Sequence, residues 1–268
     1  MRILLNGKPT EVSETTAFAL RDRLKPNGYV VVDGYGISAD VDLEEGMSVC
    51  VFSKTEAPSD DEFEALLSAR ESPETVQKMK GARVGIAGLG GLGSNVAVML
   101  TRAGIGHLVL VDCDTVDATN LNRQDYTRAD IGRRKTDAVK DRLETINPFA
   151  DVRTIFERVT AENATEIFAD CDIVVEAFDV ADSKAMLIST ILSECPDKWV
   201  VSGNGVAGYG PANDVTTTMP MRHLVMCGDG STAARVGCGL TAPHVMIASA
   251  HEANAVLRIV LGLDPLTN

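Results

Sequence analysis

The chain has 268 residues, enough for one large or two smaller domains with a sizeable core, and its formal net charge is −13. Such an acidic surface repels polynucleotides and anionic membranes. Since no apolar run approaches the roughly 18 residues of a bilayer span, we expect no nucleic acid or membrane partner and a cytoplasmic location. The six cysteines include no C-x-x-C pair, which predicts reduced thiols without a zinc site or a disulfide framework.

Residues 1–54 are predicted to form a small α+β unit with the element order ββαββ. Asn6-Gly7 is a two-residue hairpin signal between two short strands. The remaining elements are a helix and two strands, expected over 15–24, 29–32 and 49–52. The size, the order and the opening Met-Arg-Ile-Leu-Leu-Asn-Gly resemble the ubiquitin-like β-grasp of ThiS-type and MoaD-type sulfur carriers.

The end of this unit departs from a working carrier. A carrier ends in Gly-Gly, because only a tail without side chains can thread a narrow channel to the nucleotide. Residues 53–58 read Ser-Lys-Thr-Glu-Ala-Pro instead. We therefore expect that residues 1–54 are not themselves the substrate.

Residues 55–80 are polar with a helical pattern and are predicted to form a linker helix region. Ser59 and Glu62 have the spacing of a capping box, and the apolar stripe behind them stops near residues 72–73. Arg70 lies near the predicted end of this helix. It is either a solvated surface charge or a functional cation.

Residues 81–124 have the pattern of one βαβ unit with a glycine turn. Gly88, Gly90 and Gly93 have the G-x-G-x-x-G spacing that lets the backbone turn tightly, approach a phosphate and pack the helix on the sheet. The helix N-terminus then offers N–H groups to an anion. Asp112 ends the second strand, where a carboxylate can accept hydrogen bonds from ribose hydroxyls. By itself, this pattern predicts a nucleotide site.

The rest of the predicted domain, 81–268, reads as a Rossmann-like α/β fold. The stretch 117–140 is unusually basic for so acidic a chain, as a triphosphate would require. Asp179 ends a buried strand predicted over 172–179, at the strand end where ligands bind in open α/β sheets. Further helices are expected over 134–146, 161–168, 183–195 and 242–261, strands over 152–156 and 199–202, and a long loop over 221–239. The glycine-rich turn at 203–211 is either a flexible lid or a tight connection.

Several motifs, in order, resemble the ThiF, MoeB and ubiquitin-activating enzyme family. They are Gly88-Leu-Gly-Gly-Leu-Gly-Ser94, Val111-Asp-Cys-Asp-Thr-Val116 and Asn120-Leu-Asn-Arg-Gln124, followed by Lys135 and Asp179. The tailless front unit resembles a second ThiF-like family, in which a ThiS-like segment precedes the activating domain. The resemblance implies a homodimer that uses ATP and Mg²⁺ to adenylylate a separate ThiS-like carrier with a Gly-Gly end, in thiamine biosynthesis.

The resemblance also implies roles for the matching side chains. Carried over by position, they are Asp112 for the ribose, Asn120, Arg123 and Lys135 for the phosphates, and Asp179 for Mg²⁺. The other residues expected at the nucleotide are Gly88, Gly90, Gly91, Gly93, Asp114 and Gln124. Arg70 resembles the arginine that, in dimeric relatives, reaches the ATP of the other subunit.

The implied chemistry explains why no catalytic histidine is evident. The attacking carboxylate is already ionised at pH 7, so no general base is needed, and magnesium and cationic side chains stabilise the departing pyrophosphate. The two C-x-x-C pairs of zinc-binding relatives are missing, so we expect no zinc. Cys227 and Cys238 are positioned as candidates for the cysteine that receives the carrier in some relatives, but inert thiols are the preferred interpretation.

Two other functions are compatible with parts of the pattern. An NAD-dependent dehydrogenase shares the glycine turn and Asp112, but leaves the cationic cluster and Asp179 unexplained. A non-catalytic or autoinhibited ATP-binding scaffold, with the front unit occupying the carrier site, is the second alternative. The intact cationic and acidic positions argue against complete inactivity.

Overall fold

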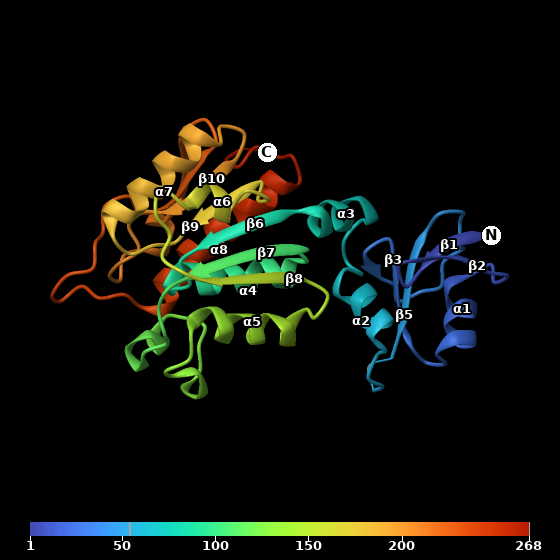
Figure 1. The fold of residues 1–268 in the computed structure, drawn as a ribbon. Helices are drawn as coiled ribbons and strands as arrows, with labels where there is room; N and C mark the ends of the chain where they lie inside the picture. Colours follow the sequence, from blue (N-terminus) through green and yellow to red (C-terminus); the bar gives the residue numbers. More distant parts are fainter. Residues whose placement is uncertain (54, 268) are drawn as a thin grey trace. The chain divides into compact units, whose positions relative to one another are not determined.

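The computed structural model describes residues 1–53 and 55–267, and the chain divides into two compact units, Met1–Gln77 and Lys78–Asn268 (Figure 1). Each unit has a hydrophobic core of its own. The boundary predicted at residue 54 falls outside the described residues. Within the described part of the chain, no helix has the length and apolar character needed to cross a membrane.

The first unit contains a five-stranded mixed sheet, on which the helix Ala17–Leu24 is packed. The strand order is β2-β1-β5-β3-β4, with β1 parallel to β5 and the other neighbouring pairs antiparallel. Asn6 and Gly7 have φ values of 47° and 75°, as a type I′ hairpin turn requires. The elements are β1 (Arg2–Leu5), β2 (Lys8–Glu11), α1 (Ala17–Leu24), β3 (Tyr29–Val32), β4 (Tyr35–Gly36) and β5 (Ser48–Phe52). The ββαββ prediction is confirmed, with the short β4 added.

The predicted linker helix consists of two helices. The first, α2 (Asp60–Leu67), begins at the predicted capping box of Ser59 and Glu62. The second, α3 (Pro73–Gly81), begins with its proline, which can open a helix because it lacks only an N–H that would be unpaired there. Arg70 therefore lies in the turn between two helices, and the prediction of one helix with Arg70 near its end is wrong.

The second unit is built on a seven-stranded sheet with the order β11-β12-β10-β9-β6-β7-β8 (Figure 1). All neighbouring strands are parallel except the edge strand β11, which is antiparallel to β12. The strands are β6 (Arg83–Ala87), β7 (His107–Asp112), β8 (Asp151–Phe156), β9 (Ile173–Glu176), β10 (Trp199–Gly203), β11 (Thr216–Met221) and β12 (Leu224–Gly228). The chain leaves β6 for β7 on one side and returns to β9 on the other, so the switch point of the sheet lies at β6.

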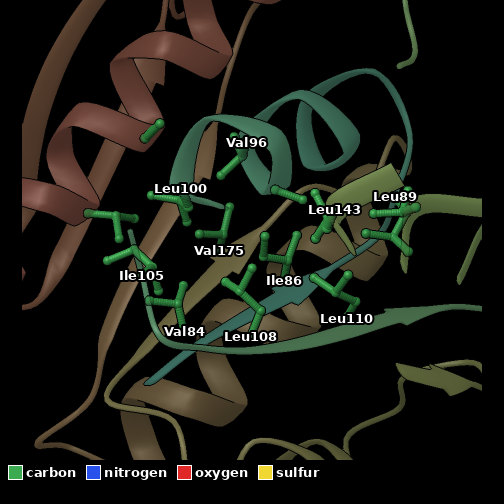
Figure 2. Close-up of a cluster of buried hydrophobic side chains, with 14 of the residues drawn as sticks. Val84, Ile86, Leu89, Val96, Leu100, Ile105, Leu108, Leu110, Leu143 and Val175 are labelled. Atoms are coloured by element: carbon green, nitrogen blue, oxygen red, sulfur yellow. The ribbon is translucent and has the colours of Figure 1, made fainter. Parts of the chain in front are cut away.

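Helices cover both faces of this sheet, which confirms the predicted Rossmann-like architecture. One core joins the sheet to α4, α5 and α8 (Figure 2), and a second core joins its other face to α6 and α7. The helices are α4 (Gly91–Ala103), α5 (Lys135–Ile146), α6 (Ala164–Ile167), α7 (Ala181–Glu194) and α8 (Ala242–Val260). Burial of side chains such as Ile86, Leu100 and Leu110 supplies the hydrophobic stabilisation of these layers.

One expected loop is wrong. The sequence pattern predicts a long loop over 221–239, yet these residues contain β12 (Leu224–Gly228), which pairs with β10 and β11. Leu224, Val225 and Cys227 are buried on this strand. A continuous buried run of five residues carries no alternation, so its periodicity did not distinguish it from a loop.

Candidate active site

The glycine turn joins β6 to α4, and close backbone packing requires glycine at two of its positions. Gly88 has a φ of +92°, and a Cβ there would lie 2.9 Å from the carbonyl oxygen of Ala177. A Cβ on Gly93 would lie 1.8 Å from the carbonyl oxygen of Gly88. Neither position can hold a side chain without moving the backbone, so the turn stays tight and bare.

The first turn of α4 presents its N–H groups to the same side. Gly90 is the N-cap and provides no side-chain hydrogen bond to the helix. Ser94 Oγ donates to Gly90 O, and Asn95 Nδ2 donates to Gly91 O, each at 2.6 Å. These side chains satisfy carbonyl oxygens of the turn. The uncapped N–H groups and the positive end of the helix dipole therefore favour an anion.

Asp112 fixes the glycine turn to the end of β7. Leu89 N, in the turn, donates to Asp112 Oδ2 at 2.7 Å, and Asp114 N donates to Asp112 Oδ1 at 2.7 Å. Burial raises the pKa of Asp112, and the positive charge of Lys135 opposes that rise. Each carboxylate oxygen retains acceptor capacity, so Asp112 can also receive hydrogen bonds from hydroxyl groups of a ligand.

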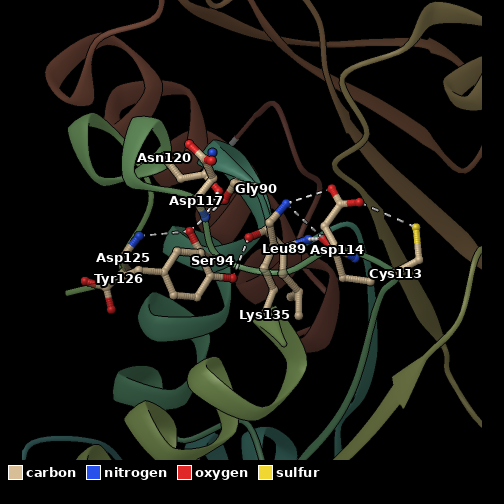
Figure 3. A network of polar contacts seen from close by, with 11 residues as sticks. Leu89, Gly90, Ser94, Cys113, Asp114, Asp117, Asn120, Asp125, Tyr126 and Lys135 are labelled. Atoms are coloured by element: carbon tan, nitrogen blue, oxygen red, sulfur yellow. Dashed lines mark hydrogen bonds and ion pairs between the residues drawn. The ribbon is translucent and has the colours of Figure 1, made fainter. Parts of the chain in front are cut away.

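Lys135 supplies positive charge to this end of the sheet. It is buried at the start of α5, and its Nζ donates to Asp114 Oδ2 at 3.0 Å (Figure 3). The same Nζ lies 3.8 Å from Asp112 Oδ2. Asp112, Cys113 and Asp114 place ligand atoms within 4.8 Å of one another, as a metal site would. The Lys135 ammonium group already lies beside both carboxylates, so we assign no metal to these three residues.

Arg123 lies across the glycine turn. Its Cγ is 3.6 Å from where a Cβ on Gly91 would be. Nη1 donates to Thr119 O at 3.2 Å and to Asn122 Oδ1 at 2.8 Å, whereas the buried Nε has no partner among the described residues. An unpaired buried donor costs on the order of 1–3 kcal/mol. A bound acceptor such as a phosphate oxygen would give this donor the partner that it lacks.

The two predicted amide side chains differ in their engagement. Asn120 Oδ1 accepts a hydrogen bond from Asp117 N at 3.1 Å, which caps the short helix Ala118–Asn122. Gln124 is buried, and its Oε1 has no partner among the residues that the structure describes. Its Nε2 lies 3.8 Å from where a Cβ on Gly90 would be. Gln124 thus lies at the turn with an unused acceptor, while Asn120 stabilises its own loop.

The strand that leads to Asp179 is shorter than predicted. It ends at Glu176, whose Oε1 accepts a hydrogen bond from Phe178 N at 2.7 Å and so helps to turn the chain away from the sheet. Asp179 is exposed beyond this turn, where its carboxylate is accessible to a cation. Sequence reasoning missed Glu176, which is fully buried. Its only signal was one acidic residue inside an otherwise apolar run.

The remaining candidates lie elsewhere. Arg70 belongs to the first unit, so the residues brought together within the second unit do not include it. Cys227 is buried on β12, and burial raises its pKa to about 12, which keeps the thiol protonated and unreactive. Cys238 is half-buried in the loop before α8.

Two regions of the chain match known families. Residues 65–268 match the ThiF family, and residues 1–55 match ThiS-like ubiquitin. The first match covers most of the chain and includes every residue of the site described above. The second covers the five-stranded sheet of the first unit.

Curated relatives carry related names. The sulfur carrier protein adenylyltransferase of Thermus thermophilus is 41% identical over 108 residues, which are 40% of this chain and 40% of that protein. The sulfur carrier protein ThiS adenylyltransferase of Bacillus subtilis is 31% identical over 203 residues, which are 73% of this chain and 59% of that protein. The chain thus spans about half the length of the curated relatives it matches.

Solved structures show the same fold. The tRNA N6-threonylcarbamoyladenosine dehydratase of E. coli, in complex with AMP, superposes with a TM-score of 0.69 at 20% identity. The superposition covers 77% of this chain and 98% of that chain. The complex of the same enzyme with ATP gives the same values. At this identity, the similarity establishes the fold of the second unit.

Proposed function

The chain belongs to the ThiF family, and from this premise we propose that it transfers AMP from ATP to the C-terminal carboxylate of a sulfur carrier protein. The observation that carries the proposal is the buried Nε of Arg123, beside the bare turn at Gly91, which has no partner in the part of the chain that the structure describes. An anion bound there would satisfy the guanidinium and meet the uncapped N-terminus of α4. The names of the two carrier adenylyltransferases among the relatives support the choice of substrate.

The proposed reaction is a substitution at the α-phosphorus of ATP. An oxygen of the carrier carboxylate forms a bond to this phosphorus, and the bond to the bridging oxygen breaks. Pyrophosphate leaves with that electron pair, so negative charge grows on the departing group. Arg123 stabilises this charge, and Lys135 contributes when it exchanges Asp114 for the nucleotide. Asp112 accepts hydrogen bonds from the ribose hydroxyls.

Magnesium is part of the proposal, with Asp179 as its ligand. A carboxylate oxygen on an exposed loop suits this hard cation, which binds proteins through one or two carboxylates together with substrate phosphates. When bound, magnesium would neutralise charge on the phosphates of ATP. The division into residues 1–54, 55–80 and 81–268 remains a proposal for the domain boundaries.

The first unit is proposed to be an accessory domain, and the carrier to be a separate protein. Lys25 Nζ, beside the end of α1, lies 3.1 Å from Glu62 Oε1 and 3.6 Å from Glu56 Oε2. These ion pairs hold the segment that follows β5 against its own unit. The sequence there also lacks Gly-Gly, so this segment cannot act as a carrier tail.

A tRNA substrate is the main competitor, because dehydratases named for a tRNA nucleoside share the fold. The formal net charge of −13 opposes it, since binding to a polynucleotide relies on cationic surface. The ThiS-like first unit also favours a protein carrier. We extend the proposal to thiamine biosynthesis, a cytoplasmic location and a homodimer in which Arg70 reaches the ATP of the other subunit.

Intact-mass spectrometry of the carrier tests this proposal. A ThiS-like carrier is incubated with the protein, ATP and Mg²⁺, beside a matched carrier that lacks its last glycine and beside total tRNA. We expect an adenylate adduct on the intact carrier alone, since the shortened tail does not reach the α-phosphorus. Modification of tRNA without a carrier adduct would overturn the proposal in favour of the dehydratase.

A further inference from the structure

Glu176 stands out as a fully buried acid at the end of β9. Its Oε1 accepts a hydrogen bond from Phe178 N at 2.7 Å. Its Oε2 accepts from Lys184 Nζ at 2.8 Å and from Ser202 Oγ at 2.5 Å. The donors come from the loop after β9, from α7 and from the neighbouring strand β10. One carboxylate therefore ties three elements together.

The hydrogen bond from Phe178 N fixes the backbone immediately before Asp179, the next residue in the chain. A backbone N–H that donates to a carboxylate paired with an ammonium group makes a charge-assisted hydrogen bond, which is stronger than a neutral one. Since Glu176 is itself anchored by Lys184 and Ser202, the turn cannot shift without breaking that bond. The direction in which Asp179 leaves the sheet is thus set by a group that is inaccessible to any ligand.

A second buried acid lies near this network. Glu252, on α8, is completely buried, and both of its oxygens lack a partner among the described residues. The charged groups that act on it are Lys184 from α7 and Glu176 from β9. Burial raises the pKa of Glu252 well above its usual value, with Lys184 opposing and Glu176 adding to the rise. The Lys184 ammonium contacts Glu176 at 2.8 Å, so the charged form of Glu252 is disfavoured.

We propose that Glu176 is a positioning residue of the adenylylation reaction, which fixes the 176–179 turn and thereby the carboxylate of Asp179. The inference rests on the proposed function, because Asp179 is assigned there as the magnesium ligand. Glu176 itself touches neither ATP nor the cation. Its effect is confined to the step that needs a correctly placed Asp179.

The substitution Glu176→Gln tests the two contacts of this side chain, with Phe178 N and with Lys184 Nζ. A carboxylate offers two acceptor oxygens, whereas an amide offers one, so the variant cannot serve both Phe178 N and Lys184 Nζ. We expect kcat to fall on the order of 10-fold to 100-fold, because small displacements of a reacting group are costly. The Kd of ATP without magnesium, measured by titration calorimetry, should change by less than about threefold, since the glycine turn is untouched.

A double-mutant cycle with Asp179→Asn distinguishes positioning from structural support. If Glu176 acts through Asp179, then Glu176→Gln should add less than about a twofold loss in the Asp179→Asn background. By calorimetry, each single variant should lose the same magnesium-dependent gain in ATP affinity. Full additivity, or an unchanged magnesium response in Glu176→Gln, would overturn the inference.

A second variant and the rate of Asp179→Asn alone complete the experiment. If Glu176→Gln does not fold, Lys184→Met tests the same anchor from a partly exposed position, with a smaller loss expected and the same non-additivity. An intact rate in Asp179→Asn would refute the proposed site itself. A reduced rate in Asp179→Asn beside an unchanged Glu176→Gln would refute only the positioning role.

Discussion

The ends of β7 and β9 flank the glycine turn of β6, and each presents a buried acid with a different task. Asp112 accepts backbone N–H groups from the glycine turn and from its own loop, and it retains acceptor capacity toward a ligand. Glu176 is saturated by three donors and enclosed by protein, while the exposed Asp179 lies beyond it. At the end of β7, Asp112 both holds the backbone and can contact a ligand. At the end of β9, Glu176 holds the backbone and Asp179 is the residue that can contact a ligand.

This difference predicts different kinetic consequences for the two strand ends. Substitutions at the β7 end should weaken ATP binding, because support and contact are lost together. Substitutions behind the β9 end should leave ATP binding without magnesium intact and slow turnover. The largest loss of adenylation rate is expected for a residue between the two strand ends that contacts the phosphates.

The largest effect is expected at Arg123, which lies across the turn between the two strand ends. Replacing Arg123 with alanine should lower the adenylation rate by ~10²-fold or more, about 3 kcal/mol, because stabilisation of the departing charge is lost. Carrier-dependent release of pyrophosphate measures this rate. Arg102→Ala, at the exposed far end of α4, is the matched control and should retain the full rate. Equal rates for both variants would remove Arg123 from the site.

The second effect sharpens the contrast at β7. Asp112→Asn should raise the Kd of ATP by about 10-fold. An amide has one acceptor oxygen, so the variant side chain cannot accept from both backbone N–H groups and from the ribose hydroxyls as the carboxylate can. Its kcat at saturating ATP should change much less. Titration calorimetry and saturation kinetics give the two quantities. A lower kcat with an unchanged Kd would make the β7 end behave like the β9 end and break the comparison.

The third effect is on stability rather than on activity, and it concerns Glu252, the buried acid behind the β9 end. The folded protein holds a proton on Glu252 that the unfolded chain releases above the ordinary pKa of 4.5, so its stability should fall as pH rises through that window. Glu252→Gln has no such proton. Its stability advantage over the parent chain should therefore grow from pH 4.5 upward, by at most about 1.4 kcal/mol per pH unit.

Urea unfolding at pH 5 and at pH 8 measures this difference. Other titrating groups cancel in the comparison of the variant with the parent chain, apart from those that couple to Glu252. A stability difference that is the same at both pH values would show that Glu252 is charged in the folded protein. In that case Lys184 would be shared between Glu252 and Glu176, and the charge assignment would fail.

The two strand ends also differ in how far the sequence predicts them. The glycine turn and Asp112 belong to one continuous βαβ unit, in which spacing alone brings the side chain to the turn. The partners of Glu176 lie 8 and 26 residues away, on α7 and β10, so only the packed sheet brings them together. Asp179 could be predicted to lie near the strand end, but not how the chain reaches it.

The same limit explains the other misses. The apolar pattern of α8 correctly predicts a helix. No local rule predicts that Glu252 on this helix is buried against β10 and its neighbours. The strand β12 is an unbroken buried run, and its pairing with β10 and β11 follows from the sheet as a whole. The sequence predicts the elements and side chains within one supersecondary unit, whereas contacts between distant elements are known only from the structure.

The most direct measurement of the central claim is exchange of labelled pyrophosphate into ATP, with magnesium and a Gly-Gly-ended carrier. Exchange requires that the carrier adenylate forms reversibly at the site of Arg123 and Asp179. We expect exchange with the intact carrier and none with a carrier lacking its last glycine. Measurable ATP binding without exchange in the presence of any such carrier would contradict it, and would favour an ATP-binding scaffold.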